Sequence, residues 1–63
     1  PLQYVIFVRL QRASRLLVES NTPLMLIAEK IGYQSEAAFS QAFKKQFNIR
    51  PGEYRRSRTS LAA

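Results

Sequence analysis

The sequence contains no cysteine and no histidine among its 63 residues. Without cysteine there is no disulfide and no thiolate metal site, and the lack of histidine also removes support for a catalytic triad or a zinc site. The four acidic residues are scattered rather than paired, which gives little support to a two-carboxylate mechanism. They are Glu19, Glu29, Glu36 and Glu53. We therefore expect no catalytic residue, no metal and no cofactor.

Long apolar runs are also missing. The segment Val5 to Val8 is far shorter than the ~20 residues that a membrane span requires, and it leads directly into Arg9. No secretory signal pattern precedes it. The simplest expectation is a cytoplasmic protein without a membrane segment.

What the sequence has instead is positive charge, with a formal net charge of +6. A small basic domain most often binds nucleic acid, although ribosome-like and anionic-membrane partners also fit the charge. A domain of this length buries only about 60% of the surface that its unfolded chain exposes. Its stability is therefore expected to be marginal.

Apolar side chains at helical spacing predict a first helix over about residues 2–19. This stripe consists of Ile6, Leu10, Ala13 and Leu17. Further large apolar residues lie around the first two turns, namely Tyr4, Val5, Phe7 and Val8. A helix that is apolar all round is usually buried on more than one side. The short chain has too little to cover both sides, so we expect these residues to stay partly exposed towards a missing partner surface.

A second helix is predicted over about residues 23–31. Thr22 is a good N-cap and Pro23 a good first helical residue. Gly32 follows where a left-handed residue is expected at the end of the helix. Two helices that meet across a short glycine-containing turn are typical of the helix-turn-helix motif.

A third helix is predicted over about residues 36–47, with Ser35 as its N-cap and Asn48 as its left-handed end. Phe39, Phe43 and Phe47 recur at helical spacing on one side. We interpret them as core rather than as a base-stacking surface, because no strand pattern supports an RNA-binding platform. The opposite side is small and polar near its N-terminus and cationic further along.

This outer side is the candidate DNA-binding site. In a recognition helix the N-terminal residues contact base edges, and lysines suit the flanking phosphates. The expected contacts are Gln34, Ser35, Glu36, Ala37, Ser40, Gln41, Lys44, Lys45 and, from a later helix, Arg55. Gln41 is a candidate base contact because glutamine can pair bidentately with adenine. Glu36 is either a partner of the helix dipole or an acceptor from cytosine, and the lysines considered alone also fit a solvated face.

A last short helix is predicted over about residues 51–57, beginning at Pro51, with Tyr54 packed inward. A basic cluster accompanies it, consisting of Arg50, Arg55, Arg56 and Arg58. For Arg55 and Arg56 the pattern allows either an internal salt bridge or a contact to the DNA backbone. Residues 58–63 are expected to form a flexible tail.

Taken together, the residues resemble the DNA-binding domain of the AraC/XylS family of bacterial transcription regulators, over about residues 1–56. The linker-helix pattern of that family is seen in Pro1, Tyr4, Arg9, Leu10, Ala13, Leu16 and Leu17. Its helix-turn-helix pattern is seen in Ile27, Ala28, Gly32, Tyr33, Phe39, Ser40, Phe43, Lys44, Phe47, Pro51, Tyr54 and Arg55. The sequence departs from the family at Asn48, usually glycine, and at Arg50, usually a serine cap, so the last helix is expected to fray.

The resemblance implies an all-α fold: a homeodomain-like three-helix unit over residues 20–57, preceded by a long linker helix over residues 1–19. It also implies a truncated domain, in which the first of the family's two helix-turn-helix units is missing. It further implies sequence-specific binding to double-stranded DNA within a bacterial transcription regulator. The implied partners are the missing N-terminal unit, an effector or dimerisation domain, and RNA polymerase.

Two other classes of function remain open at this point. The same fold can serve as a protein-interaction module, docking onto RNA polymerase or onto the missing half-domain. Some DNA-repair methyltransferases also carry this type of DNA-binding unit, but this sequence holds no residues for chemistry. An interaction face would be more apolar than the predicted outer side of the third helix.

Overall fold

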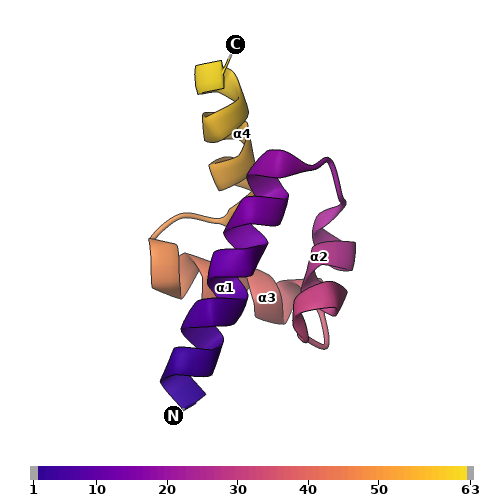
Figure 1. The fold of residues 1–63 in the computed structure, drawn as a ribbon, viewed down its shortest axis with the longest axis vertical. Coiled ribbons are helices and arrows are strands. Elements are labelled where there is room, and N and C mark those ends of the chain that lie inside the picture. The colour runs from indigo at the N-terminus through magenta and orange to yellow at the C-terminus, as the bar shows by residue number, and fades with distance from the viewer. Residues whose placement is uncertain (1, 63) are drawn as a thin grey trace.

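The computed structural model describes residues 2–62, with side chains up to Arg58, and within this range it is entirely helical, without strands (Figure 1). The helices are α1 (Leu2–Glu19), α2 (Leu24–Ile31), α3 (Glu36–Phe47) and α4 (Pro51–Ala62). In Figure 1, α1 crosses in front of α3, and α2 lies to the right of α1. α4 begins near the C-terminal end of α1 and extends away from the other helices. The predicted all-α helix-turn-helix fold with a long first helix is confirmed.

The core lies where α1, α2 and α3 meet. Its buried side chains are Leu10, Ala13, Leu17, Ile27, Ala28, Ile31, Phe39 and Phe43. The apolar stripe predicted for the first helix is therefore correct, with Ile6 half-buried at its edge. Burial of this apolar surface is the main force that holds the three helices together.

Aromatic rings extend the core from α3 to α4. The ring centroid of Phe43 lies 5.8 Å from that of Phe39, 4.5 Å from that of Phe47 and 5.4 Å from that of Tyr54. Phe39 and Phe43 are fully buried, while Phe47 and Tyr54 are half-buried and pack against them. These contacts confirm the interpretation of the three phenylalanines as core and the inward packing of Tyr54.

Gly32 ends α2 and allows the chain to turn into α3. Its φ of 100° lies in the left-handed region, as predicted. Its N–H donates to the carbonyl of Glu29 at 3.2 Å, and the N–H of Tyr33 donates to that of Ala28 at 2.9 Å. Both bonds belong to the Schellman arrangement, which satisfies carbonyls that the end of a helix leaves without partners.

The start of α2 differs from the prediction. Pro23, not Thr22, is the N-cap, with φ −59° and ψ 149°, and its carbonyl accepts from the N–H groups of Leu26 and Ile27, both at 3.0 Å. The hydroxyl of Thr22 instead accepts from the hydroxyl of Ser20 at 2.9 Å. A local bond between two side chains in the connection therefore replaces the expected cap.

The end of α4 also differs. The helix continues to Ala62, whereas the prediction ended it near Ser57. The sequence after Ser57 has no glycine or proline to stop a helix. The carbonyl of Arg50 accepts from the N–H of Tyr54 at 2.9 Å and closes the first turn. The flexibility expected of residues 58–63 stays a prediction, and Ala63 lies outside the described residues.

Asn48 ends α3 in the left-handed conformation, and its replacement by glycine is expected to stabilise the chain. Its φ is 63°, and its N–H donates to the carbonyl of Lys44 at 2.7 Å. Glycine adopts this conformation without the steric cost of a Cβ atom, so Asn48→Gly should raise the free energy of unfolding by about 0.5 kcal/mol in urea titrations. The control Gln46→Gly, inside the helix, should lower it by about 1 kcal/mol. Destabilisation by Asn48→Gly would contradict this account.

Candidate DNA-binding interface

The turn before α3 and the outer face of α3 carry every predicted contact residue except Arg55. The exposed ones are Gln34, Ser35, Glu36, Ala37, Gln41, Lys44 and Lys45. Ser40 is half-buried and lies at the edge of the face. The structure therefore brings these residues together on one continuous surface, which we call the α3 face.

The N-terminal end of α3 is fixed by its cap. Ser35 has an extended backbone, with φ −148° and ψ 158°, and its hydroxyl oxygen accepts from the N–H of Ala38 at 3.1 Å. This confirms the predicted N-cap. Glu36 follows in the first turn, where a carboxylate interacts favourably with the helix dipole. The residues that would approach base edges are thus held on a well-defined first turn.

Gln41 lies at the centre of the α3 face. Successive residues of a helix are rotated by about 100°, which places Gln41 opposite the buried side chains of Phe39 and Phe43. Ala38 is also exposed and shares this side of the helix with Gln41 and Lys45. Ala38 is not among the residues predicted from the sequence, although its helical spacing from Gln41 indicates the same side.

The two lysines occupy different edges of the α3 face. Lys45 lies at the rim of an open groove of about 680 Å³ between α1 and α3. The groove is lined by Gln3, Ile6, Phe7, Leu10, Tyr33, Ala42, Lys45 and Gln46. Lys44 is rotated by about 100° from Lys45, towards the side of Ala37. Their cationic groups thus flank the centre of the face.

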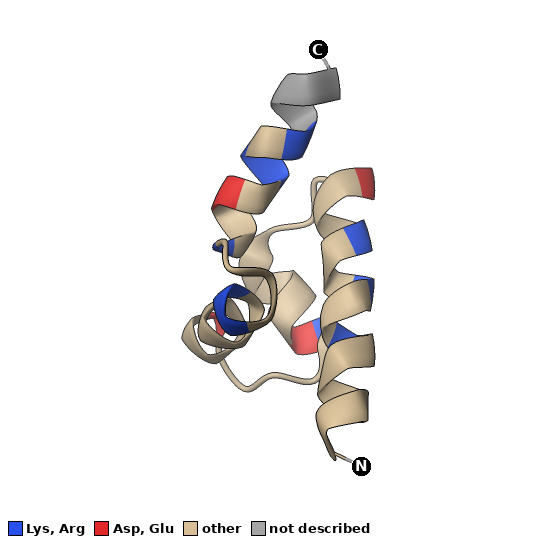
Figure 2. Ribbon diagram, turned by 90° about the vertical axis from the view of Figure 1, so that its left-hand side faces the viewer, with Lys and Arg blue, Asp and Glu red and all other residues tan. Residues whose placement is uncertain are grey.

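Positive charge on α1 is separate from the α3 face. Figure 2 shows blue segments along the side of α1 that is turned away from α3. Arg12 and Arg15 are exposed on α1. The side chain of Arg9 instead lies against Gly32. A Cβ atom placed on that glycine would be 3.3 Å from Nη1 of Arg9. The α1 arginines are therefore not part of the candidate interface.

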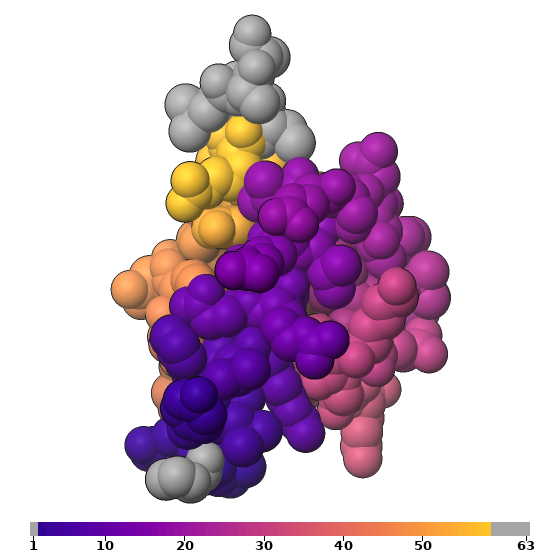
Figure 3. Space-filling view, in the orientation of Figure 1, coloured from indigo at the N-terminus to yellow at the C-terminus, as the bar shows by residue number. Residues whose placement is uncertain are grey.

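The N-terminal turns of α1 expose apolar side chains. The exposed fraction runs from 38% for Val8 through 42% for Val5 and Phe7 to 67% for Tyr4. In Figure 3 this part of α1, in indigo, forms the lower surface of the molecule. The prediction that these residues are not covered by the chain itself is confirmed. We call this surface, together with the adjoining groove, the α1 apolar surface.

Arg55 lies on α4, and the structure gives it an internal role. Its Nε donates to the carbonyl of Leu17 at 2.8 Å and its Nη2 donates to that of Thr22 at 2.7 Å. The side chain is half-buried. The sequence pattern left an internal salt bridge and a DNA contact open; these two bonds join the guanidinium to backbone carbonyls within the domain. Arg55 therefore has internal bonds, and its contact with DNA stays a prediction.

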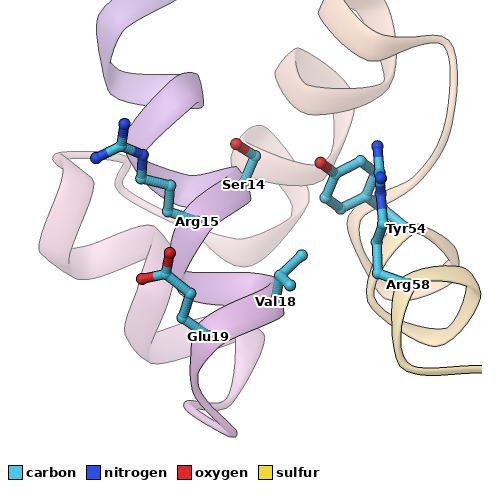
Figure 4. A pocket seen from close by; sticks show the side chains of 6 residues that line it. All are labelled: Ser14, Arg15, Val18, Glu19, Tyr54 and Arg58. Carbon is cyan, nitrogen blue, oxygen red and sulfur yellow. The ribbon is translucent and has the colours of Figure 1, made fainter. Parts of the chain in front are cut away.

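A shallow groove between α1 and α4 contains none of the predicted DNA contacts (Figure 4). It is lined by Ser14, Arg15, Val18, Glu19, Tyr54 and Arg58. The guanidinium carbon of Arg58 lies 5.1 Å from the centre of the Tyr54 ring, a cation–π contact. This contact holds one member of the predicted basic cluster against the domain.

None of the helices in the described range is both long and apolar enough to cross a membrane.

The sequence comparisons agree with the fold. A family model described as a helix-turn-helix domain matches residues 1–57. The chain is similar to the RCS-specific HTH-type transcriptional activator RclR of Escherichia coli, with 40% identity over 62 residues, which is 98% of this chain and 22% of that protein.

Further similarities point in the same direction. The HTH-type transcriptional regulator AlkR of Acinetobacter baylyi is 51% identical over 55 residues, which is 87% of this chain and 18% of that protein. Among solved structures, the C-terminal domain of AraT, a response regulator from Geobacillus stearothermophilus, matches with a TM-score of 0.82 at 40% identity. That match covers 84% of this chain and 44% of the AraT chain. The chain thus spans only 22% and 18% of the length of these two curated relatives.

Proposed function

The chain belongs to the AraC-type helix-turn-helix family, and from this premise we propose that it binds double-stranded DNA sequence-specifically within a bacterial transcription regulator. The α3 face enters the major groove, and α2 packs across α3 from behind. The observation that carries the proposal is the exposure of Ala37, Gln41 and Lys44 on a helix whose other side forms the core. Because chromosomal DNA lies in the bacterial cytoplasm, the proposed localisation is cytoplasmic.

The α3 face divides into base contacts and phosphate contacts. The amide of Gln41 can donate to and accept from one adenine edge at the same time. Lys44 and Lys45 approach phosphates on either side as point charges. Small side chains at Ala37 and Ala38 allow the helix backbone to come close to the groove floor. The carboxylate of Glu36 either stabilises the helix dipole or accepts from a cytosine.

A protein-interaction role for the α3 face has less support, because that face is polar and cationic rather than apolar. Contact with RNA polymerase stays a proposal for a different surface. Met25 and Leu26 are exposed on α2, 57% and 44% respectively, and suit a protein partner. The proposed activity is binding without catalysis, since the relatives are regulators and no candidate site for chemistry was found in the sequence.

The α1 apolar surface suits a preceding helix-turn-helix unit. Exposed tyrosine, valine and phenylalanine side chains on consecutive turns favour burial against another protein surface. The two-unit domain of the family places a helical unit before this helix. The difference in length from the curated relatives leaves room for that unit and for an effector or dimerisation domain.

Salt dependence of DNA affinity tests the proposed function. A single helix-turn-helix unit should bind a duplex weakly, with a Kd in the non-specific range of ~10⁻⁴–10⁻⁶ M. Because lysines that contact phosphates release bound counterions, the affinity should fall steeply as salt rises. Titration of a fluorescent duplex at several salt concentrations measures both quantities. An affinity that does not change with salt would instead favour the protein-interaction role.

A further inference from the structure

Arg55 connects three parts of the chain that are far apart in sequence. Its Nε donates to the carbonyl of Leu17, in the last turn of α1, and its Nη2 donates to the carbonyl of Thr22, in the connection to α2. These partners lie 38 and 33 residues away along the chain. One side chain of α4 therefore holds both the end of the first helix and the entry to the helix-turn-helix unit.

A guanidinium suits this place. The last carbonyls of a helix have no partners within the helix and carry partial negative charge. The last turn of α1 has no basic residue of its own, and Arg55 supplies the missing cation from another helix. Its planar group directs donors towards two carbonyls at once, which the single flexible ammonium of a lysine does not do in a fixed geometry.

The packing between α1 and α4 is incomplete around these bonds. An open groove of about 260 Å³ separates the two helices and contains Ser14 and Val18 on one side and Arg58 on the other (Figure 4). Val18 stays 42% exposed in it. Figure 1 shows α4 leading away near the end of α1. Tyr54 of α4 packs against the core to which α1 contributes, so the groove lies beside this contact and Arg55 adds two polar bonds to it.

We propose that Arg55 is a positioning residue that, together with the core shared by α1, α2 and α3, fixes the angle between α1 and the helix-turn-helix unit. This angle determines the direction of the α3 face relative to the α1 apolar surface. The consequence for DNA rests on the proposed function. A DNA-binding unit docked on α1 and the α3 face would each contact the duplex, and the distance between their two contact sites is constant only if this angle is fixed. Arg55 thereby influences which spacing of DNA contacts is recognised without itself contacting DNA.

The angle can be measured without DNA. Because the chain has no cysteine, spin labels attached at Gln3→Cys and Glu29→Cys are the only labels present. Both positions are exposed, one on α1 and one on α2. Double electron–electron resonance should give one narrow distance distribution in the parent chain. It should give a broader distribution in both Arg55→Ala and Arg55→Lys, because neither retains the two directional bonds.

Arg12→Ala is the matched control. It removes the same charge from an exposed position on α1 and should leave the distribution narrow. Circular dichroism shows which variants are folded, and Arg55→Lys is the milder change if Arg55→Ala unfolds. A narrow distribution in Arg55→Lys overturns the proposal, since positive charge alone then suffices. A narrow distribution in Arg55→Ala overturns it as well.

A second readout separates positioning from a DNA contact. If Arg55 contacts a phosphate, Arg55→Ala should reduce the salt dependence of duplex binding by about one phosphate, and Arg55→Lys should restore it. That result overturns the proposal, which expects the salt dependence of both variants to equal that of the parent chain. The distance measurement involves no DNA. Its result therefore tests the role of Arg55 even if the chain does not bind DNA as proposed.

Discussion

Phe43→Ala is expected to unfold most of the chain at room temperature. Truncating a fully buried phenylalanine typically costs about 3–5 kcal/mol, through lost burial and the cavity that remains. The core of a domain below about 70–80 residues rarely supplies more than about 3–5 kcal/mol of net stability. The expected loss therefore equals the whole free energy of unfolding, and a thermal melt followed by circular dichroism should show no cooperative transition.

The size of this effect follows from the position of the Phe43 ring. It is fully buried and contacts the rings of Phe39, Phe47 and Tyr54, so its removal weakens the contact between α3 and α4 as well as the core. Phe47→Ala is the control, because Phe47 is only half-buried and should lose less stability. A cooperative melt of Phe43→Ala within a few degrees of the parent would show that the aromatic core is not the main source of stability.

The features of α3 were predictable because they depend on neighbours in the sequence. The N-cap at Ser35, the left-handed Asn48 and the buried Phe39 and Phe43 all follow from side-chain type and helical spacing. The two caps depend on contacts within about one turn of the helix, and the buried side follows from the helical spacing, although its contacts are made with the other helices. The residues of the α3 face follow from the same periodicity, although Ala38 was left out.

The differences from the prediction lie at two helix ends, the start of α2 and the end of α4. Thr22 is a good cap by type, but its hydroxyl bonds to Ser20, and Pro23 takes the N-cap position. The sequence predicts an end of the last helix near Ser57, followed by a flexible tail. No glycine or proline stops the helix there, and it continues to Ala62. Propensity alone does not decide either case.

The role of Arg55 was beyond the reach of the sequence pattern. Two of its acceptors, at Leu17 and Thr22, are backbone carbonyls, which have no residue-type signature, and they lie on segments that come together only in the folded chain. Considered with its neighbours, Arg55 is one member of a basic cluster beside a predicted DNA-binding helix. In the folded chain it bonds to the last turn of α1 and to the connection before α2.

Gln41→Ala should change the sequence preference of DNA binding. It removes the proposed base-edge contact at the centre of the α3 face, so it should cost about 1–3 kcal/mol at the preferred site and relax selection at one or two base positions. The measurement is a binding-site selection with the longer regulator proposed above, in which affinity is high enough for a sequence profile. The melting curve should stay close to that of the parent, because Gln41 is exposed.

Lys44→Ala provides the contrast. A point charge on a phosphate carries no sequence information, so this change should weaken binding to all sequences alike and reduce the salt dependence by about one phosphate. Arg12→Ala removes an equal charge from an exposed position on α1, outside the α3 face. It should leave the sequence profile unchanged and reduce the salt dependence less than Lys44→Ala does. If Lys44→Ala reshapes the profile while Gln41→Ala leaves it unchanged, the assignment of base contact and phosphate contact is reversed. If neither change affects binding to DNA, α3 is not the recognition helix.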